Sequence, residues 1–286
     1  MLSIFLILLK ICFVLGMGLL LLMLFFSLLL TWSWAQFESQ NRQVGLVELL
    51  STAAIEWGAM VSILGAHFYR PGILWEVPRF EDKLSSQNLR PTQIPIILVP
   101  SLHVGPSVFC FLYLRLKSHY FQSLWPFQFK SFLKDSIFLE KQLKDFLLEV
   151  VTKTASPRCV IISFGTSYPI VSRVLANQTS KTKFDWIAIS GASKMPDTLK
   201  FVSSSSLNSA YVDETKQIPD LSLYGDKDTV CYPKNIFLGK QKLEIPEVGH
   251  FGALLHSKCS HSILTELQSI RLKEQELKLS AEERSS

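Results

Sequence analysis

The sequence of 286 residues lacks several features that mark particular classes of protein. Its five cysteines are widely separated and odd in number, which fits neither the close ligand pairs of a zinc site nor a dense disulfide framework. No group of His, Cys or acidic residues has metal-ligand spacing, so we expect no metal and no cofactor. The net charge of +5 is spread along the chain without a basic run interleaved with aromatics, which argues against a nucleic-acid partner.

Charge is also absent from a long apolar segment near the N-terminus, Ile11 to Trp34. At about 1.5 Å per residue, this segment is long enough to cross a hydrocarbon core of about 30 Å. Trp32 and Trp34 at its far end suit the headgroup zone, and Lys10 at its near end favours a cytoplasmic N-terminus. We therefore predict a single-pass membrane anchor over residues 1–35, with the rest of the chain outside the cytoplasm, on the periplasmic side of an inner membrane.

Two alternatives to this topology stay open. Ser33-Trp34-Ala35 resembles the cleavage site of a signal peptide, although the apolar segment exceeds the usual apolar core of about 7 to 15 residues. The pattern from Val44 to Arg70 predicts a second apolar helix, and a second span there would place the domain in the cytoplasm. Because this helix carries Glu56 near its middle, and a charge there costs at least about 2.5 kcal/mol in a bilayer, we prefer an interfacial or domain-packed helix.

The remainder divides into a juxtamembrane helix and linker (36–93), a folded domain (94–270) and a charged C-terminal tail (271–286). Strands are predicted at Ile96–Val99, Arg158–Phe164, Phe184–Ser190 and Leu221–Tyr224, and Lys242–Pro246 is strand-like. Helices are predicted at Ser107–Lys117, Phe132–Lys153, Ile170–Ala176 and Ile263–Ser286, the last of them fraying. This alternation predicts an α/β fold with a mostly parallel sheet, helices on both faces, and a ligand site at the carboxyl edge of the strands.

A candidate nucleophile follows the second predicted strand. Gly165-Thr166-Ser167 stands between that strand and a helix, which is the strand, sharp turn and helix of a nucleophile elbow. In this arrangement a serine lies at the apex of the turn, and a small neighbour lets strand and helix approach closely. Ser167 is therefore the predicted nucleophile, although a serine that merely caps the helix fits the same triplet.

An acid and a base follow in the order that a serine hydrolase requires. Asp228 lies in an acidic turn directly after an apolar strand, where its carboxylate can orient an imidazole. His250 lies in the glycine-flanked loop Val248-Gly249-His250-Phe251-Gly252, in the last part of the domain. The order Ser, Asp, His is that of α/β-hydrolases, so we predict Ser167, Asp228 and His250 as a catalytic triad.

The segment Val248 to Leu255 resembles the histidine loop of small bacterial lipases, which are minimal, essentially lidless α/β-hydrolases. The order of elements matches that family from about Ile94 to Leu267. The resemblance implies the α/β-hydrolase fold, an acyl-serine mechanism, and an oxyanion hole formed by the backbone N–H groups of Leu102 and Tyr168.

The sequence departs from this family at three places. Pro100-Ser101 replaces His-Gly after the first strand, Thr166 replaces a histidine before the serine, and Pro169 stands where glycine is usual. Proline is tolerated in the first turn of a helix, but the loss of His-Gly alters the loop that shapes the oxyanion hole. His103, two residues further on, either rebuilds part of that loop or is a solvated loop residue.

The sequence therefore predicts a membrane-anchored serine hydrolase that cleaves carboxylic esters of lipid or acyl type. Two alternatives stay open. A thioesterase or acyltransferase would use the same triad, because fold and triad do not specify the leaving group or acceptor. A catalytically impaired protein would retain the fold for binding or membrane scaffolding, and the altered Pro100-Ser101 loop favours this alternative.

Overall fold

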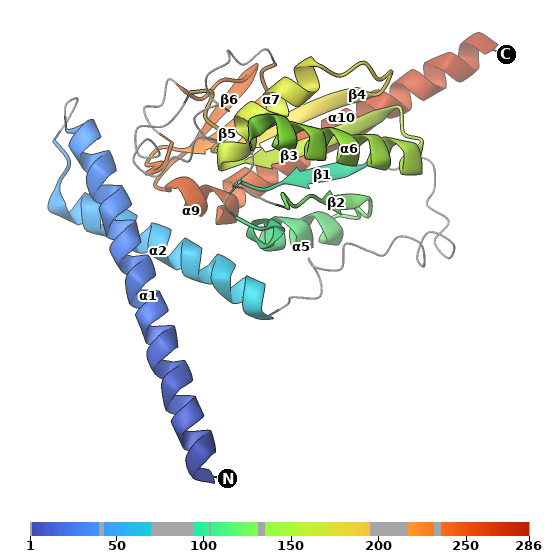
Figure 1. The fold of residues 1–286 in the computed structure, drawn as a ribbon. Helices are drawn as coiled ribbons and strands as arrows, with labels where there is room; N and C mark the ends of the chain where they lie inside the picture. Colours follow the sequence, from blue (N-terminus) through green and yellow to red (C-terminus); the bar gives the residue numbers. More distant parts are fainter. Residues whose placement is uncertain are drawn as a thin grey trace.

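A parallel sheet forms the centre of the protein. The computed structural model describes residues 2–39, 43–69, 94–102, 104–130, 135–194, 217–231 and 236–285, so the predicted linker after residue 70 and His103 lie outside the described residues. The strands are β1 (Ile96–Val99), β2 (Leu124–Pro126), β3 (Arg158–Phe164), β4 (Lys183–Ile189), β5 (Leu221–Gly225) and β6 (Gln241–Ile245). Their order is β2-β1-β3-β4-β5-β6 and all pairs are parallel (Figure 1), which confirms the predicted α/β class.

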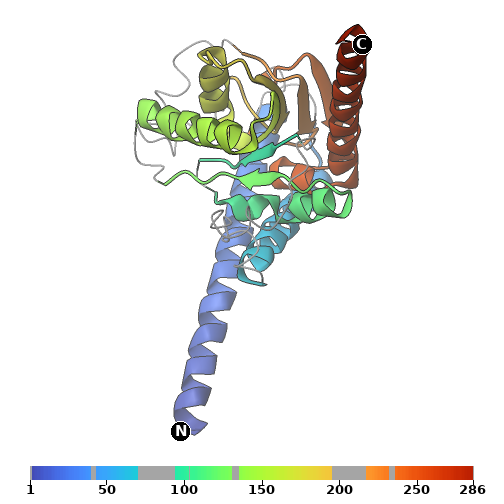
Figure 2. The same cartoon turned by 90° about the vertical axis from the view of Figure 1, so that its right-hand side faces the viewer.

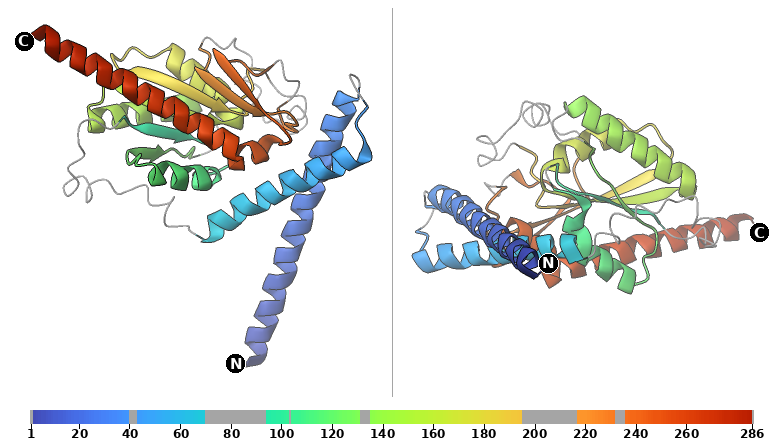
Figure 3. Two further views of the ribbon diagram at one scale, coloured as in Figure 1. Left: turned by 180° about the vertical axis from the view of Figure 1, so that it is seen from behind. Right: turned by 60° about the horizontal axis from the view of Figure 1, so that its bottom comes forward.

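Helices cover both faces of this sheet (Figure 2). One face carries α6 (Ser136–Thr154) and α7 (Tyr168–Ala176). The other carries α5 (Cys110–Ser118), which follows the short 3-10 helix η1 (Pro106–Phe109), and then α9 (His250–Leu255) and α10 (Ser257–Ser285). Seen from behind, α10 runs across the sheet and beyond its far edge (Figure 3).

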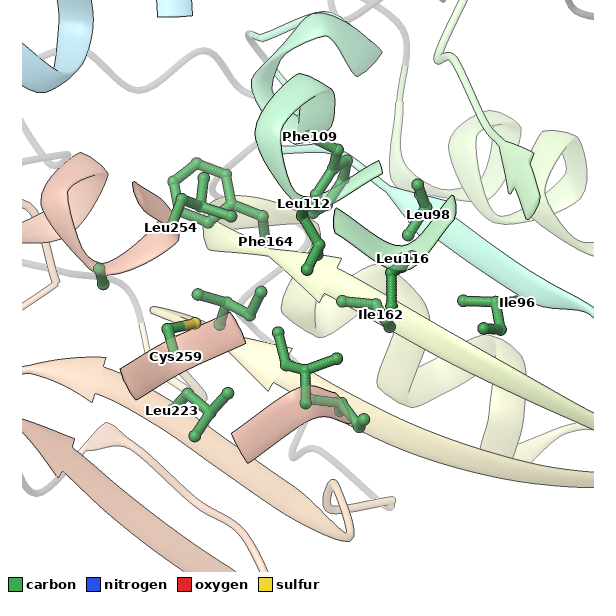
Figure 4. Close-up of a cluster of buried hydrophobic side chains, with 14 of the residues drawn as sticks. Ile96, Leu98, Phe109, Leu112, Leu116, Ile162, Phe164, Leu223, Leu254 and Cys259 are labelled. Carbon is green, nitrogen blue, oxygen red and sulfur yellow. The ribbon is translucent and has the colours of Figure 1, made fainter. Parts of the chain in front are cut away.

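Successive side chains of a strand point to opposite faces of the sheet, and the central strands β1 and β3 are buried on both faces, whereas β6 at the sheet edge is mostly exposed. In β1, Ile96 and Leu98 pack toward α5 and α10, whereas Ile97 and Val99 pack toward α6 and α7. Figure 4 shows the first of these two cores, where Phe164 at the end of β3 lies among side chains from the helices. The two cores hold the sheet from both faces, and the site lies at the carboxyl ends of its strands.

The structure corrects several predicted elements. β2 has no counterpart among the predicted strands, because its three residues end in a proline at the sheet edge, too short for a periodic pattern. The predicted helix at 107–117 is a 3-10 turn followed by α5, and α6 begins at Ser136 after the capping side chain of Asp135. α10 begins at Ser257, earlier than the predicted start at Ile263, and runs to Ser285.

Two apolar helices precede the sheet, α1 (Leu2–Glu38) and α2 (Leu46–Tyr69). By length and composition alone, Phe13–Gln36 and Leu46–Gly65 are each able to cross a membrane. The amino-terminal part of α1 projects away from the domain (Figure 1), while its carboxyl-terminal part lies against α2. α2 itself packs on α9, η1 and α5.

Candidate active site

The turn after β3 takes its shape from Gly165. β3 ends at Phe164 in extended backbone, and Gly165 then adopts φ +62°, the left-handed region that glycine enters without a Cβ penalty. Residues 165–167 form one 3-10 turn, and α7 begins at Tyr168. The sharp reversal that defines a nucleophile elbow therefore lies at Gly165, two residues before the serine that the sequence pattern indicated.

The structure places Ser167 away from His250, which corrects its predicted position at the apex of the turn. Its backbone is already helical, at φ −75° and ψ −12°, and its side chain is fully buried. The Oγ atom donates to the carbonyl oxygen of Phe164 at 3.0 Å and lies 3.5 Å from that of Val99. Ser167 thus ties the ends of β3 and β1 together, and no hydrogen bond within the described residues joins it to His250.

The structure does bring Asp228 and His250 together. Asp228 follows β5, and His250 is the first residue of α9, after β6. The Nδ1 atom of His250 lies 3.1 Å from both carboxylate oxygens of Asp228, and both side chains are buried. The backbone N–H groups of Val230 and Cys231 also donate to Asp228 Oδ1, at 3.0 and 2.7 Å, so the carboxylate is held on several sides.

The far side of the imidazole faces Gly165. A Cβ at position 165 would lie 3.2 Å from His250 Nε2 and 3.2 Å from Ser101 Oγ. A hydroxyl on that Cβ would reach Nε2, as the nucleophile reaches its base in a serine hydrolase. The position from which a nucleophile would face this Asp–His pair is therefore occupied by glycine.

The predicted oxyanion donors are also placed differently. The N–H of Leu102 points at the site but donates to Thr166 Oγ1 at 3.2 Å. The N–H of Thr166, the residue after the elbow glycine, donates to Ser101 Oγ at 3.4 Å, and the two hydroxyl oxygens lie 2.6 Å apart. The N–H of Tyr168 donates to the carbonyl of Gly165 inside the 3-10 turn, which corrects its predicted role as a donor to an oxyanion.

Electrostatics at the site favour a charged imidazole. Burial lowers the pKa of His250, but attraction to Asp228, the hydrogen bond to Asp228 and the nearby carboxylate of Glu56 outweigh burial and raise it above its ordinary value. Cys231 Sγ lies near this pair, and the closest donor atoms of Asp228, Cys231 and His250 are all within 4.8 Å of one another. Because Asp228 Oδ1 already accepts hydrogen bonds from two backbone N–H groups and lies 3.1 Å from His250 Nδ1, we interpret the group as a hydrogen-bonded pair and not as a metal centre.

A signal for the role of Gly165 was present in the sequence. The elbow pattern has small residues two positions before and after its centre. Centred on Ser167, it requires a small residue at position 169, where proline stands, but centred on Gly165 it has Ser163 and Ser167 at these positions. The exception at Pro169 was thus a sign that the centre of the pattern lies two residues earlier.

Comparisons with known proteins give a likeness of structure only. No protein-family model matches the chain, and no curated protein sequence matches it. A lipase-esterase related protein from Clostridium acetobutylicum is similar at 11% identity and TM-score 0.47, over 63% of this chain and 95% of that one. An esterase from Exiguobacterium antarcticum is similar at 15% identity and TM-score 0.45, over 62% of this chain and 92% of the esterase. Aspergillus fumigatus lipase B is similar at 12% identity and TM-score 0.46, and the match covers 58% of this chain and 50% of the lipase.

Proposed function

We propose that this chain, which has the α/β-hydrolase fold, is a membrane-anchored protein that uses the fold for binding and does not carry out acyl-serine catalysis. The observation that carries the proposal is Gly165, which occupies the elbow with φ +62° and whose missing Cβ would lie 3.2 Å from His250 Nε2. A base without a hydroxyl at this position has no nucleophile to activate. The ligand that we expect is an acyl ester or a lipid, which the site would hold without forming a covalent bond.

The oxyanion region supports the same proposal. Stabilisation of a tetrahedral intermediate needs two N–H donors aimed at the developing oxyanion, and loss of one donor costs about 2.7 to 4 kcal/mol of transition-state stabilisation. Here the N–H groups of Leu102 and Thr166 are engaged by the hydroxyls of Thr166 and Ser101. A substrate carbonyl would have to displace both hydroxyls before it received either hydrogen bond.

A hydrolase with a relocated nucleophile is the second candidate, and Ser101 is the observation that favours it. Its Oγ atom lies 3.2 Å from the same point beside His250 Nε2 that a Cβ at position 165 would occupy. The buried Asp228–His250 pair is the base that such a serine would need. In this second candidate function, Ser101 is the nucleophile in place of Ser167, and the chain is a serine ester hydrolase.

The membrane side of the proposal rests on α1. We infer that α1 is a single-pass anchor whose N-terminus, marked by Lys10, lies in the cytoplasm, so that the domain lies on the extracytoplasmic side. The carboxyl end of α1 would then lie at the headgroup level, where Trp32 is exposed. A reporter fused to the C-terminus tests this orientation, and a cytoplasmic reporter would contradict it.

Labelling by a fluorophosphonate, with hydrolysis of p-nitrophenyl esters beside it, tests the function. We expect the detergent-solubilised protein to show neither labelling nor turnover, and Ser167→Ala and Ser101→Ala to behave in the same way. Labelling that disappears in Ser101→Ala would establish the second candidate. Labelling that disappears only in Ser167→Ala would overturn both readings of the elbow.

A further inference from the structure

A buried carboxylate lies in the middle of the apolar helix α2. Glu56 is only 2% exposed, and no positively charged side chain is hydrogen-bonded to it within the described residues. An ionised carboxylate without water is costly unless hydrogen bonds replace its hydration. The hydrogen bonds that Glu56 accepts therefore identify the part of the domain that this position of α2 contacts.

Glu56 holds the start of α9, the helix that His250 begins. The backbone N–H of Phe251 donates to Glu56 Oε2, and that of Gly252 donates to Oε1, both at 3.0 Å. A Cβ at Gly249 would lie 2.5 Å from the carboxyl group, and one at Gly252 would lie 3.2 Å from it. Gly249 and Gly252 thus leave the space that the Glu56 carboxyl occupies. The contact depends both on the acid of α2 and on the two glycines near His250.

The two apolar helices form one unit on the domain, which we call the hairpin (α1 and α2). Ser27 Oγ of α1 donates to the carbonyl of Ala53 in α2 at 2.7 Å, and Trp57 Nε1 of α2 donates to the carbonyl of Leu20 at 3.2 Å. On the domain, Leu30 of α1 packs in a cluster with Cys231. The backbone N–H of Cys231 donates to Asp228 Oδ1. The hairpin therefore contacts the site from both sides, beside Asp228 through α1 and beside His250 through α2.

We propose that the hairpin is a lid on the Asp228–His250 site and that Glu56 is the latch that holds it closed. When the contact between Glu56 and the amides of α9 breaks, α2 loses its polar attachment beside His250, and the hairpin separates from the domain at the site. The class of ligand is that of the proposed function, but the lid does not depend on whether the site binds or cleaves it.

The charge state of Glu56 sets how tightly the latch holds. Burial raises the pKa of Glu56 to about 7, while the two backbone N–H groups and His250 lower it and Asp228 raises it. Lys227, beside Asp228, lies 3.8 Å from Glu48 of α2. The facing parts of η1 and α1 bring no charged residue, and α5, which also packs on α2, carries Arg115 and Lys117. A raised pKa means that the closed state binds a proton more tightly than the open state. Closure is therefore strongest below pH about 4.5 and weakens as the pH rises through about 7.

Hydrogen exchange on the full-length protein in detergent micelles tests the latch. The probe is the peptide around Phe251 and Gly252, with exchange corrected for the intrinsic effect of pH. Between pH 5.5 and pH 8 we expect its protection to fall about 30-fold in the wild type. Glu56→Gln, which cannot ionise, is expected to show no such fall, while Glu149→Gln, on the exposed side of α6, behaves as the wild type.

A second variant and an internal reference keep the outcomes separate. Gly249→Ala places a methyl group against the carboxyl and should give low protection at both pH values, with no change of charge. Strand β3 serves as the reference, because its protection stays high if only the lid opens. Equal protection of the wild type at both pH values, a parallel fall in β3, or a Glu56→Gln profile that follows the wild type would each overturn the latch. None of these results bears on fluorophosphonate labelling, which tests the proposed function separately.

Discussion

Gly165→Ser is the substitution that tests the reading of the elbow most directly. It places a hydroxyl on a Cβ that lies 3.2 Å from His250 Nε2, within reach of the base that Asp228 orients. If Gly165 holds the position of the nucleophile, this one change supplies the missing member of the triad. We therefore expect Gly165→Ser to gain labelling by a fluorophosphonate that the wild type lacks.

The size of the effect follows from the backbone and the oxyanion region. A serine at φ +62° costs about 1 to 3 kcal/mol of folding free energy, since this region strains any residue that has a Cβ. Ester turnover should stay low, because losing one oxyanion donor alone reduces kcat about 10² to 10³-fold and both are engaged here. Adding Ser101→Gly frees the N–H of Thr166 and should raise turnover about 10²-fold over Gly165→Ser alone.

The assay compares labelling and unfolding of Gly165→Ser with those of Gly165→Ala. The alanine variant carries the same Cβ and the same backbone strain but no hydroxyl, so it separates nucleophile chemistry from a change in stability. Labelling of Gly165→Ser should also disappear when His250→Ala is added. If Gly165→Ser is as stable as Gly165→Ala and takes no label, position 165 does not face the base, and the elbow has been assigned wrongly.

Four further substitutions test the pairing at the site and the ion pair near the amino ends of β3 and β4. Ser167→Ala should lower the free energy of unfolding by about 1 to 3 kcal/mol, because a buried carbonyl loses its partner, as measured by urea denaturation. Asp185→Ala leaves the buried Arg158 unpaired and should cost about 3 to 5 kcal/mol, whereas Lys183→Ala, on an exposed side chain near the same carboxylate, should cost less than about 1 kcal/mol. Asp228→Asn removes the attraction that raises the pKa of His250, so the imidazole should titrate at lower pH in an NMR titration; an unchanged pKa would contradict the pairing.

Much of the fold could be predicted because its central strands are buried on both faces. The seven residues of β3 are all buried and mostly apolar, turn residues follow them, and the predicted bounds, Arg158 to Phe164, agree with the structure. β2 could not be found in this way, because three residues ending in Pro126 carry no period. The pattern of apolar residues also says nothing about strand order, which depends on the packing of the helices between the strands.

The candidate site was harder to predict, because its decisive properties depend on backbone angles and on contacts between distant residues. The spacing in Gly165-Thr166-Ser167 leaves open which residue turns the chain; Pro169 is a sign against Ser167, and the φ of +62° at Gly165 identifies the residue. Glu56 was recognised from the sequence only as a charge that disfavours a membrane span. Its partner in the structure is the loop around His250, 195 residues further along the chain. The same acid that disfavours a second span is thus the residue that accepts hydrogen bonds from the start of α9, a contact that no pattern within α2 could predict.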